Sequence, residues 1–227
     1  MSIDVSIIIP AYNEAAVIRS AVRRAWEAGA RQVIVVDGSS RDDTLARARG
    51  CECLAMHAPR GRAAQLNAGA RQATCDVLLF LHADNWLEPG GTDQIAQALT
   101  DPAIPGGAFR QQIDATPFVY RWIERWAALR ARFGRAFGDQ GIFIRRELFQ
   151  SIGGFPEVAF MEDVLFMKKM RSLWRPALLA GPIHTSARRW RQHGVVRQTL
   201  LNWSLLSAVK FGVSPDRLAR FYPPHSK

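Results

Sequence analysis

Four short apolar runs, separated by stretches with helical spacing, constrain the fold of this chain most strongly. Residues 5–10, 33–36 and 77–81 are continuous runs of mainly Val, Ile and Leu, and residues 54–57 form a weaker one. Such runs are typical of strands buried on both faces of a parallel sheet. Residues 16–28 and 61–73 have helical character, and Ser40 three residues before Asp43 predicts a capping box for a helix reaching Gly50. The alternation predicts a doubly wound α/β sheet.

The second half of the chain follows a different pattern after Pro105. We expect strands at residues 106–113 and 138–144, and helices at 118–137, before Gly153-Gly154, and at 161–173. No linker rich in Pro, Gly or Ser interrupts the chain, and no repeat is present. We therefore predict one domain over residues 1–227, with a C-terminal helical extension from about Gly194.

Polar residues follow three of the predicted strands at the point where each strand ends. The clusters are Tyr12-Asn13-Glu14, Asp37-Gly38-Ser39 and His82-Ala83-Asp84. Ligands of doubly wound sheets bind beyond the carboxyl ends of the strands, so these clusters predict a site. Asp37 suits hydrogen bonds from a base or ribose, although Asp-Gly is also a common turn pair. Asp84 is a hard oxygen ligand suited to Mg²⁺ or Mn²⁺.

Charge and cysteine content limit the class of protein. The 30 Lys and Arg residues against 20 Asp and Glu give a formal charge of +10, which attracts nucleic acid, anionic membranes or phosphorylated substrates. We expect no nucleic-acid partner, because no binding motif for one stands out.

Three cysteines without framework spacing argue against a disulfide scaffold and fit a reducing compartment. Neither a signal peptide nor a spanning segment is expected, which favours a cytoplasmic location.

Four ordered motifs carry a resemblance to a known family. They are Ile-Pro-Ala-Tyr-Asn-Glu at 9–14, Val-Val-Asp-Gly-Ser-Ser at 35–40 with Asp-Asp-Thr at 42–44, the segment 61–70, and Phe-Leu-His-Ala-Asp at 80–84. Their order and spacing resemble the nucleotide-binding half of family 2 glycosyltransferases. Gly-Asp-Gln-Gly at 138–141, Gly-Gly-Phe at 153–155 and Glu162-Asp163 resemble the acceptor half. The similarity covers roughly residues 3 to 190 and is closest to a small bacterial subgroup called "rSAM/selenodomain-associated transferase 2".

This resemblance implies a GT-A fold, in which a Rossmann-like, mostly parallel sheet is flanked by helices. The nucleotide-binding half would span about residues 1–104, the acceptor half 105–193 and the C-terminal helices 194–227. The implied activity is metal-dependent, inverting transfer of a sugar from a nucleotide-sugar donor to an acceptor hydroxyl.

The resemblance also implies roles for particular residues. The residues implied to line the base and ribose pocket are Pro10, Ala11, Tyr12 and Glu14, with Asp37 holding the base. Further substrate contacts are implied for Arg62, Asn67, Asp139, Gln140 and Glu162. Asp84 would bind Mn²⁺ or Mg²⁺ at the diphosphate, and Asp163 would be the general base. The alternative for Glu162-Asp163 is an acidic pair favoured by a helix N-terminus.

Two positions depart from the family's pattern. His82 occupies the place of an acidic residue two positions before Asp84, and imidazole suits Mn²⁺ better than Mg²⁺. It would bind the metal, contact phosphate or pack at the strand end. Ser186 replaces the Gln of the Gln-x-x-Arg-Trp motif of processive relatives, which weakens any inference of polymer synthesis.

Three residues near Ser186 are further site candidates. Arg188 and Arg189 would clamp diphosphate or acceptor, with Trp190 beside them. His184 lies where some GT-A enzymes supply a metal or phosphate contact, and its alternative role is structural.

Two basic, aromatic segments suggest a surface partner. Tyr120, Trp122, Trp126 and Phe133 alternate with Arg121, Arg125, Arg130 and Arg132, and residues 197–210 are similar, with Leu200, Leu201, Trp203 and Leu206. Such segments favour a peripheral contact with the inner face of a membrane or a lipid-linked acceptor, and a homodimer interface is the alternative.

Two other functions compete with sugar transfer. A nucleotidyltransferase on the same fold would need a Gly-rich basic loop after the first strand, where this chain has Tyr12-Asn13-Glu14. A non-enzymatic module that binds membrane or RNA is supported only by the basic charge.

Overall fold

A mixed sheet of eight strands forms the centre of the molecule, in the order β3-β2-β1-β4-β7-β6-β8-β5. The computed structural model describes residues 3–187, 190, 194–211 and 213–218. The strands are β1 (Val5–Ala11), β2 (Gln32–Asp37), β3 (Leu54–His57), β4 (Val77–Phe80), β5 (Asn85–Leu87), β6 (Gly106–Asp114), β7 (Ile142–Arg145) and β8 (Ala177–Ser186).

The first four strands confirm the predicted parallel arrangement, and the later ones do not continue it. β3, β2, β1 and β4 are parallel neighbours. β7 is antiparallel to both β4 and β6, while β8 is parallel to β6 and antiparallel to β5. The sheet is therefore Rossmann-like in its N-terminal half and mixed in its C-terminal half.

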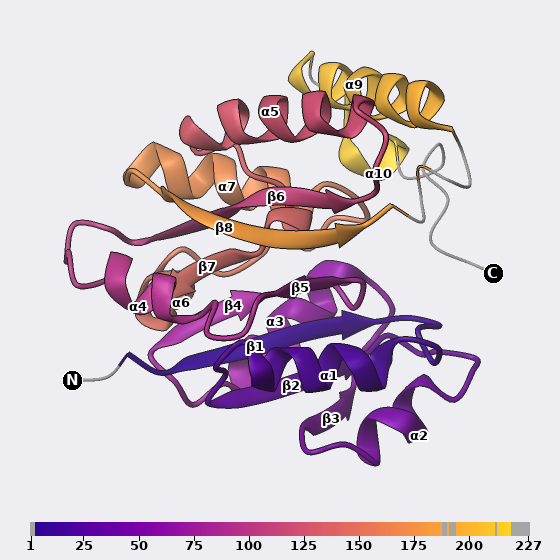
Figure 1. The fold of residues 1–227 in the computed structure, drawn as a ribbon, viewed down its shortest axis with the longest axis vertical. Coiled ribbons are helices and arrows are strands. Elements are labelled where there is room, and N and C mark those ends of the chain that lie inside the picture. Colours follow the sequence, from indigo (N-terminus) through magenta and orange to yellow (C-terminus); the bar gives the residue numbers. More distant parts are fainter. Residues whose placement is uncertain (1–2, 188–189, 191–193, 212, 219–227) are drawn as a thin grey trace.

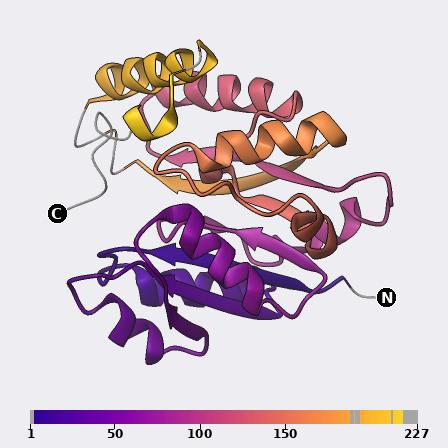
Figure 2. The same ribbon diagram turned by 180° about the vertical axis from the view of Figure 1, so that it is seen from behind.

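Helices cover both faces of the sheet, as Figures 1 and 2 show from opposite sides. Alternate residues of β1 pack on opposite faces of the sheet, because successive side chains of a strand point to opposite sides. Ile7 and Ile9 pack with α1 (Ile18–Glu27), α2 (Thr44–Arg49) and α4 (Asp93–Ala98). Ile8 packs with α3 (Arg62–Gln72), α6 (Arg146–Ser151) and α7 (Glu162–Leu173).

The predicted helical extension is present beyond Gly194. α9 (Val195–Lys210) runs beside α5 (Val119–Arg132) along the upper edge of Figure 1, and α10 (Pro215–Leu218) lies below it. Leu205 and Leu218 pack against Met161, directly before α7. The extension therefore covers the start of α7. Within the described part of the chain, no helix is both long and apolar enough to cross a bilayer.

Several sequence expectations differ from the structure. The capping box at Ser40 and Asp43 is wrong, because α2 begins at Thr44 without a side-chain cap and the Ser40 Oγ accepts the Asn13 N–H at 2.9 Å instead. The strand expected at 138–144 is divided, since Gly138–Gln140 forms a 3₁₀ turn, η1, before β7. No strand was predicted for residues 177–186, where the structure forms β8, and Gly181-Pro182 lies at a register shift of this strand against β6.

Candidate active site

A cleft of about 860 Å³, its open mouth included, lies where the N-terminal half of the sheet meets the later elements. Its polar lining comes from the start of α3, the turn after β4, the start of β5, η1, the start of α7 and the end of β8: Arg62, His82, Asp84, Asn85, Asp139, Asp163, Thr185 and Ser186. Its apolar lining comes mainly from the segment before α7 and from α9: Phe160, Met161, Val164, Leu205 and Leu206. The structure thus brings Asp84 and Asp163, far apart in the sequence, into one cleft.

Asp163 lies in the first turn of α7, and its carboxylate accepts hydrogen bonds from two main-chain N–H groups. Its Oδ2 accepts the Gly138 N–H at 2.6 Å and its Oδ1 accepts the Val164 N–H at 2.8 Å. A Cβ at Gly138 would lie 3.1 Å from Asp163 Oδ2 and 3.0 Å from His82 Nε2. The absence of a side chain at position 138 therefore lets η1 approach both groups, and the carboxylate is fixed in orientation.

Glu162 and Arg62 form an ion pair between the first turns of α7 and α3. The Arg62 Nε donates to Glu162 Oε1, and the Glu162 side chain is only 2% exposed. Burial raises the pKa of Glu162; Arg62 opposes that shift, and the neighbouring Asp163 adds to it. The net pKa is above the ordinary 4.5, so the folded state holds this proton more tightly than the unfolded chain.

This raised pKa predicts a loss of stability with rising pH. The contribution is fully present below pH 4.5, the ordinary value, and is lost as the pH rises through the higher folded-state pKa. Glu162→Gln cannot ionise, so its unfolding free energy should depend less on pH than that of the parent between about pH 4 and 8. Urea unfolding across this range measures both slopes. The exposed Glu157, as Glu157→Gln, is the matched control, and equal slopes in parent and Glu162→Gln would contradict the assignment.

Asp84 presents its carboxylate to the cleft from the turn between β4 and β5. Its main-chain carbonyl accepts the Ser186 N–H at 3.2 Å, whereas its carboxylate makes no hydrogen bond or ion pair with any residue that the structure describes. His82 lines the same cleft two residues earlier. The described residues contain no cluster of three or more His, Cys, Asp or Glu suited to a metal.

Asp139 and Gln140 occupy different environments although they are adjacent. Asp139 lines the cleft, and its Oδ2 accepts from Gln111 Nε2 at 2.9 Å. Gln140 is fully buried: its Oε1 accepts from Arg130 Nη2 at 3.1 Å, and its Nε2 donates to the Phe109 carbonyl at 3.2 Å. The structure thus buries the side chain of Gln140, the last residue of η1, away from the surface of the cleft.

Arg130 is a half-buried cation near Asp139 and Asp163 that the motifs did not identify. Burial lowers its pKa to about 10, and the carboxylates of Asp139 and Asp163 oppose that shift. Its guanidinium also lies 3.1 Å from the centroid of the Phe137 ring. Arg130 therefore remains charged, and its positive charge stabilises the carboxylates of Asp139 and Asp163.

Asp37 lies at the same strand edge as Asp84, but it does not line the cleft. Asp37 is the last residue of β2 and Asp84 follows β4, and these two strands flank β1. Asp37 Oδ2 accepts the Ser40 N–H at 3.0 Å, and its buried Oδ1 has no hydrogen-bond partner among the described residues. An unsatisfied buried oxygen is costly, so this atom indicates a place where a ligand would donate a hydrogen bond.

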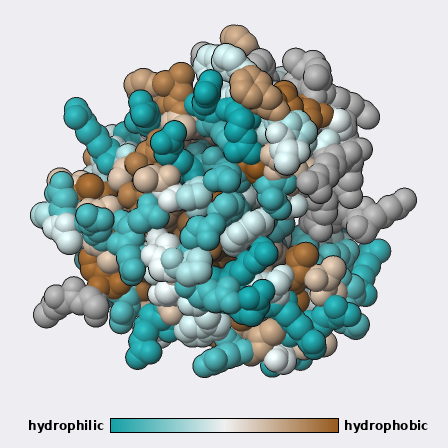
Figure 3. Space-filling view, in the orientation of Figure 1, coloured by the Kyte–Doolittle hydropathy of each residue, from teal (hydrophilic) through white to brown (hydrophobic). Residues whose placement is uncertain are grey.

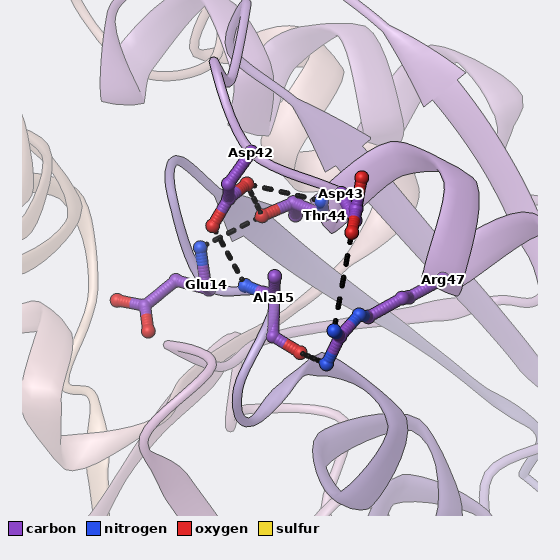
Figure 4. Close-up of polar contacts among 6 residues, drawn as sticks. All are labelled: Glu14, Ala15, Asp42, Asp43, Thr44 and Arg47. Atoms are coloured by element: carbon purple, nitrogen blue, oxygen red, sulfur yellow. Dashed lines mark hydrogen bonds and ion pairs between the residues drawn. The ribbon is translucent and has the colours of Figure 1, made fainter.

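Hydrogen bonds join the loops after β1 and β2 (Figure 4). Thr44 Oγ1 accepts the Glu14 N–H at 2.8 Å, and Asp42 Oδ2 accepts the Ala15 N–H at 3.1 Å. The Glu14 carboxylate points away from this group of bonds. These contacts hold the segment that carries Pro10, Ala11, Tyr12 and Glu14 next to the end of β2.

Tyr12 contacts a cation from the loop before α3. The Arg60 guanidinium lies 4.4 Å from the centroid of the Tyr12 ring. A planar, charged group stacked on an aromatic ring forms a flat surface at this strand edge.

Two expected contacts lie away from the cleft. The Asn67 amide donates to the Phe155 carbonyl at 2.8 Å and accepts the Phe155 N–H at 2.9 Å, so it braces the chain after α6. The His184 ring stacks on Trp86, with 5.2 Å between centroids, and its Nε2 lies 2.6 Å from Glu88 Oε1. Neither side chain is among those that line the cleft.

Of the three residues expected near the end of β8, only Trp190 is described. It lines the cleft and packs edge-on against Tyr120, with 6.0 Å between ring centroids. Arg188 and Arg189 lie outside the described residues.

Comparison with known proteins agrees with this arrangement. Residues 6–152 match the family profile described as Glycosyl transferase family 2. A PGL/p-HBAD biosynthesis glycosyltransferase of Mycobacterium bovis is 28% identical over 211 residues, which cover 88% of this chain and 82% of the relative. An undecaprenyl-phosphate 4-deoxy-4-formamido-L-arabinose transferase of Sodalis glossinidius is 30% identical over 160 residues, covering 64% of this chain and 49% of that protein.

Solved structures show the same fold. The mannosyltransferase PcManGT from Pyrobaculum calidifontis, in complex with GDP-Man and Mn²⁺, aligns with a TM-score of 0.61 at 22% identity, covering 97% of this chain and 68% of that one. S. aureus TarS 1–349 in complex with UDP-GlcNAc aligns with a TM-score of 0.63 at 20% identity, covering 81% and 58%. The mixed sheet flanked by helices is a GT-A fold, and the profile match covers more than half of the chain. The narrower subgroup stays a prediction, but the chain belongs to glycosyl transferase family 2.

Proposed function

We propose that this glycosyltransferase is a single catalytic domain over residues 1–227 that uses a nucleotide-sugar donor and a divalent cation, and that it inverts the transferred sugar. The observation that carries the proposal is the presence of Asp84 and Asp163 in one cleft at the carboxyl edge of the sheet. The complexes of PcManGT with GDP-Man and Mn²⁺ and of TarS with UDP-GlcNAc support the donor class.

The donor base would bind at the end of β2. The buried Asp37 Oδ1 has no partner among the described residues and would accept an N–H from the base. Tyr12, stacked with Arg60, and Glu14 would line the base and ribose together with Pro10 and Ala11. From there the diphosphate would extend past β1 toward Asp84, where Arg62 would offset its charge.

The residues around Asp84 fit a divalent cation. The Asp84 carboxylate makes no bond with the described residues, and His82 would supply a nitrogen ligand, which favours Mn²⁺ over Mg²⁺. The donor phosphates would complete the coordination shell. When bound, the cation stabilises the negative charge of the departing diphosphate.

Asp163 would act as the general base. The acceptor oxygen attacks the anomeric carbon while its proton passes to the Asp163 carboxylate, and the bond from that carbon to the diphosphate oxygen breaks. The N–H groups of Gly138 and Val164 keep the carboxylate pointed in one direction before the reaction begins. A single displacement of this kind inverts the anomeric configuration.

The acceptor hydroxyl would belong to a molecule with an apolar body. Phe160, Met161, Trp190, Leu205 and Leu206 give the same cleft an apolar surface. The relative from Sodalis glossinidius, whose name specifies undecaprenyl phosphate, supports a lipid-linked acceptor. We propose that the enzyme meets such an acceptor at the cytoplasmic face of a membrane. Arg188, Arg189 and Asp139 remain predicted substrate contacts.

A thermal-shift panel of nucleotide sugars, with and without Mn²⁺, tests the proposal. At a hundredfold excess over its dissociation constant, a ligand of the native state adds about 2.7 kcal/mol to stability. One nucleotide sugar should raise the melting temperature in the presence of Mn²⁺. A shift with nucleoside triphosphate and release of pyrophosphate would point to a nucleotidyltransferase. Salt-sensitive binding of lipid or RNA without any nucleotide-sugar shift would point to a non-enzymatic module.

A further inference from the structure

One face of α5 exposes a row of large apolar side chains. Its members are Phe118, Trp122, Trp126, Leu129 and Phe133, each between 46% and 67% exposed. Their spacing of three or four residues places them along one side of the helix, and we call this row the aromatic stripe. Tyr120, Ala127, Ala128 and Ala131 on the other side are buried. Figure 3 shows brown, apolar residues interleaved with teal, hydrophilic ones along the upper edge of the molecule.

The charge beside the aromatic stripe has a single sign. Arg125, Arg132 and Arg135 are exposed, and the Arg125 guanidinium lies 5.7 Å from the centroid of the Trp122 ring. Glu124 is the only acidic residue of α5; its side chain is 13% exposed and pairs with Arg121 at 2.9 Å. The exposed side of α5 thus combines aromatic residues with positive charge that no neighbouring exposed carboxylate of the helix offsets.

We propose that the aromatic stripe is a docking surface for an anionic lipid bilayer. Trp, Phe and Leu side chains enter the boundary between headgroups and acyl chains, while arginines contact the lipid phosphates. A second copy of this chain fits less well, because a symmetric contact would bring the arginines of both copies together. The inference rests on the proposed function for one point, the biological role of docking: a bilayer would present a lipid-linked acceptor to the cleft.

Flotation of the full chain with vesicles measures this docking. Vesicles of phosphatidylcholine alone are compared with vesicles containing about one third phosphatidylglycerol, to which the parent should bind more tightly at low salt. Trp126→Ser should weaken binding to the anionic vesicles by about tenfold. Arg125→Gln with Arg132→Gln should weaken it by about twenty-five-fold, at roughly fivefold for each arginine.

Matched variants on the far side of the molecule provide the controls. Leu54→Ser removes an exposed apolar side chain from the edge strand β3, and Arg31→Gln with Arg49→Gln removes the same charge as the arginine pair. Both controls should bind like the parent. Equal binding by Trp126→Ser and Leu54→Ser would overturn the proposal, as would self-association of the parent that Trp126→Ser abolishes while vesicle binding is unchanged.

The change in melting temperature on adding a nucleotide sugar tests the proposed function independently of vesicle binding. Trp126→Ser should retain the full shift in melting temperature, because Trp126 does not line the cleft. The parent could bind vesicles and yet show no change in melting temperature with any nucleotide sugar. That result would support the docking surface and reject the proposed chemistry.

Discussion

Asp163→Asn should lower the rate of sugar transfer by about 100- to 10,000-fold, the usual contribution of a general base. The amide cannot take the proton of the acceptor hydroxyl, whereas its size matches that of the carboxylate. Donor binding should change little, because the donor would interact chiefly with Asp37, Arg62 and Asp84. Single-turnover transfer measured beside donor titration separates the two effects.

The folded state of Asp163→Asn should be slightly less stable than the parent. Asp163 accepts one N–H from Gly138 and one from Val164, and an amide offers only one oxygen for the two donors. We expect a loss of about 1 kcal/mol in unfolding free energy, which urea unfolding can measure. Transfer at the parental rate by this folded variant would contradict the role of Asp163. His82, whose Nε2 lies close to the same position beside Gly138, would then be the next candidate base.

Asp84→Ala should remove the metal-dependent part of donor binding, with a loss in affinity of about 100-fold or more in the presence of Mn²⁺. Asp84 is the one carboxylate of the turn after β4 that lines the cleft, and it would anchor the cation against the diphosphate. Calorimetric titration of the donor, with and without Mn²⁺, measures the difference. Without metal, parent and variant should bind the donor with similar affinity.

His82→Asp is the companion variant for the metal site. It places a second carboxylate two residues before Asp84, and carboxylates suit Mg²⁺ better than imidazole does. The parent should prefer Mn²⁺, and this variant should bind the donor about as well with Mg²⁺. If donor affinity is the same with and without metal, and the same in the parent and in Asp84→Ala, the cation site lies elsewhere.

The positions of Asp37 and Asp84 could be predicted because they depend on local pattern. Each follows a buried apolar strand, and the carboxyl ends of parallel strands meet at one edge of a sheet. The Glu162-Asp163 pair was placed by its motif, and the structure adds that Gly138 and Val164 orient one carboxylate while Arg62 pairs with the other.

The remaining differences come from contacts between residues distant in the sequence. Asn67 resembles a polar ligand contact, but its amide is occupied by Phe155, which lies 88 residues later. His184 pairs with Glu88, and Gln140 is buried against Arg130 and Phe109. β8 pairs with β6 across the Gly181-Pro182 irregularity, where the Gln94 amide also bonds both the N–H and the carbonyl of Gly181. None of these partners can be read from the local sequence, because tertiary packing selects them.

A crystal structure with Mn²⁺ and a nucleotide sugar, examined by anomalous scattering at the manganese edge, tests the central claim most directly. The claim predicts a manganese peak bonded to the Asp84 carboxylate and the diphosphate, with the anomeric carbon of the sugar facing Asp163. Manganese and diphosphate bound on another surface, away from both carboxylates, would contradict it.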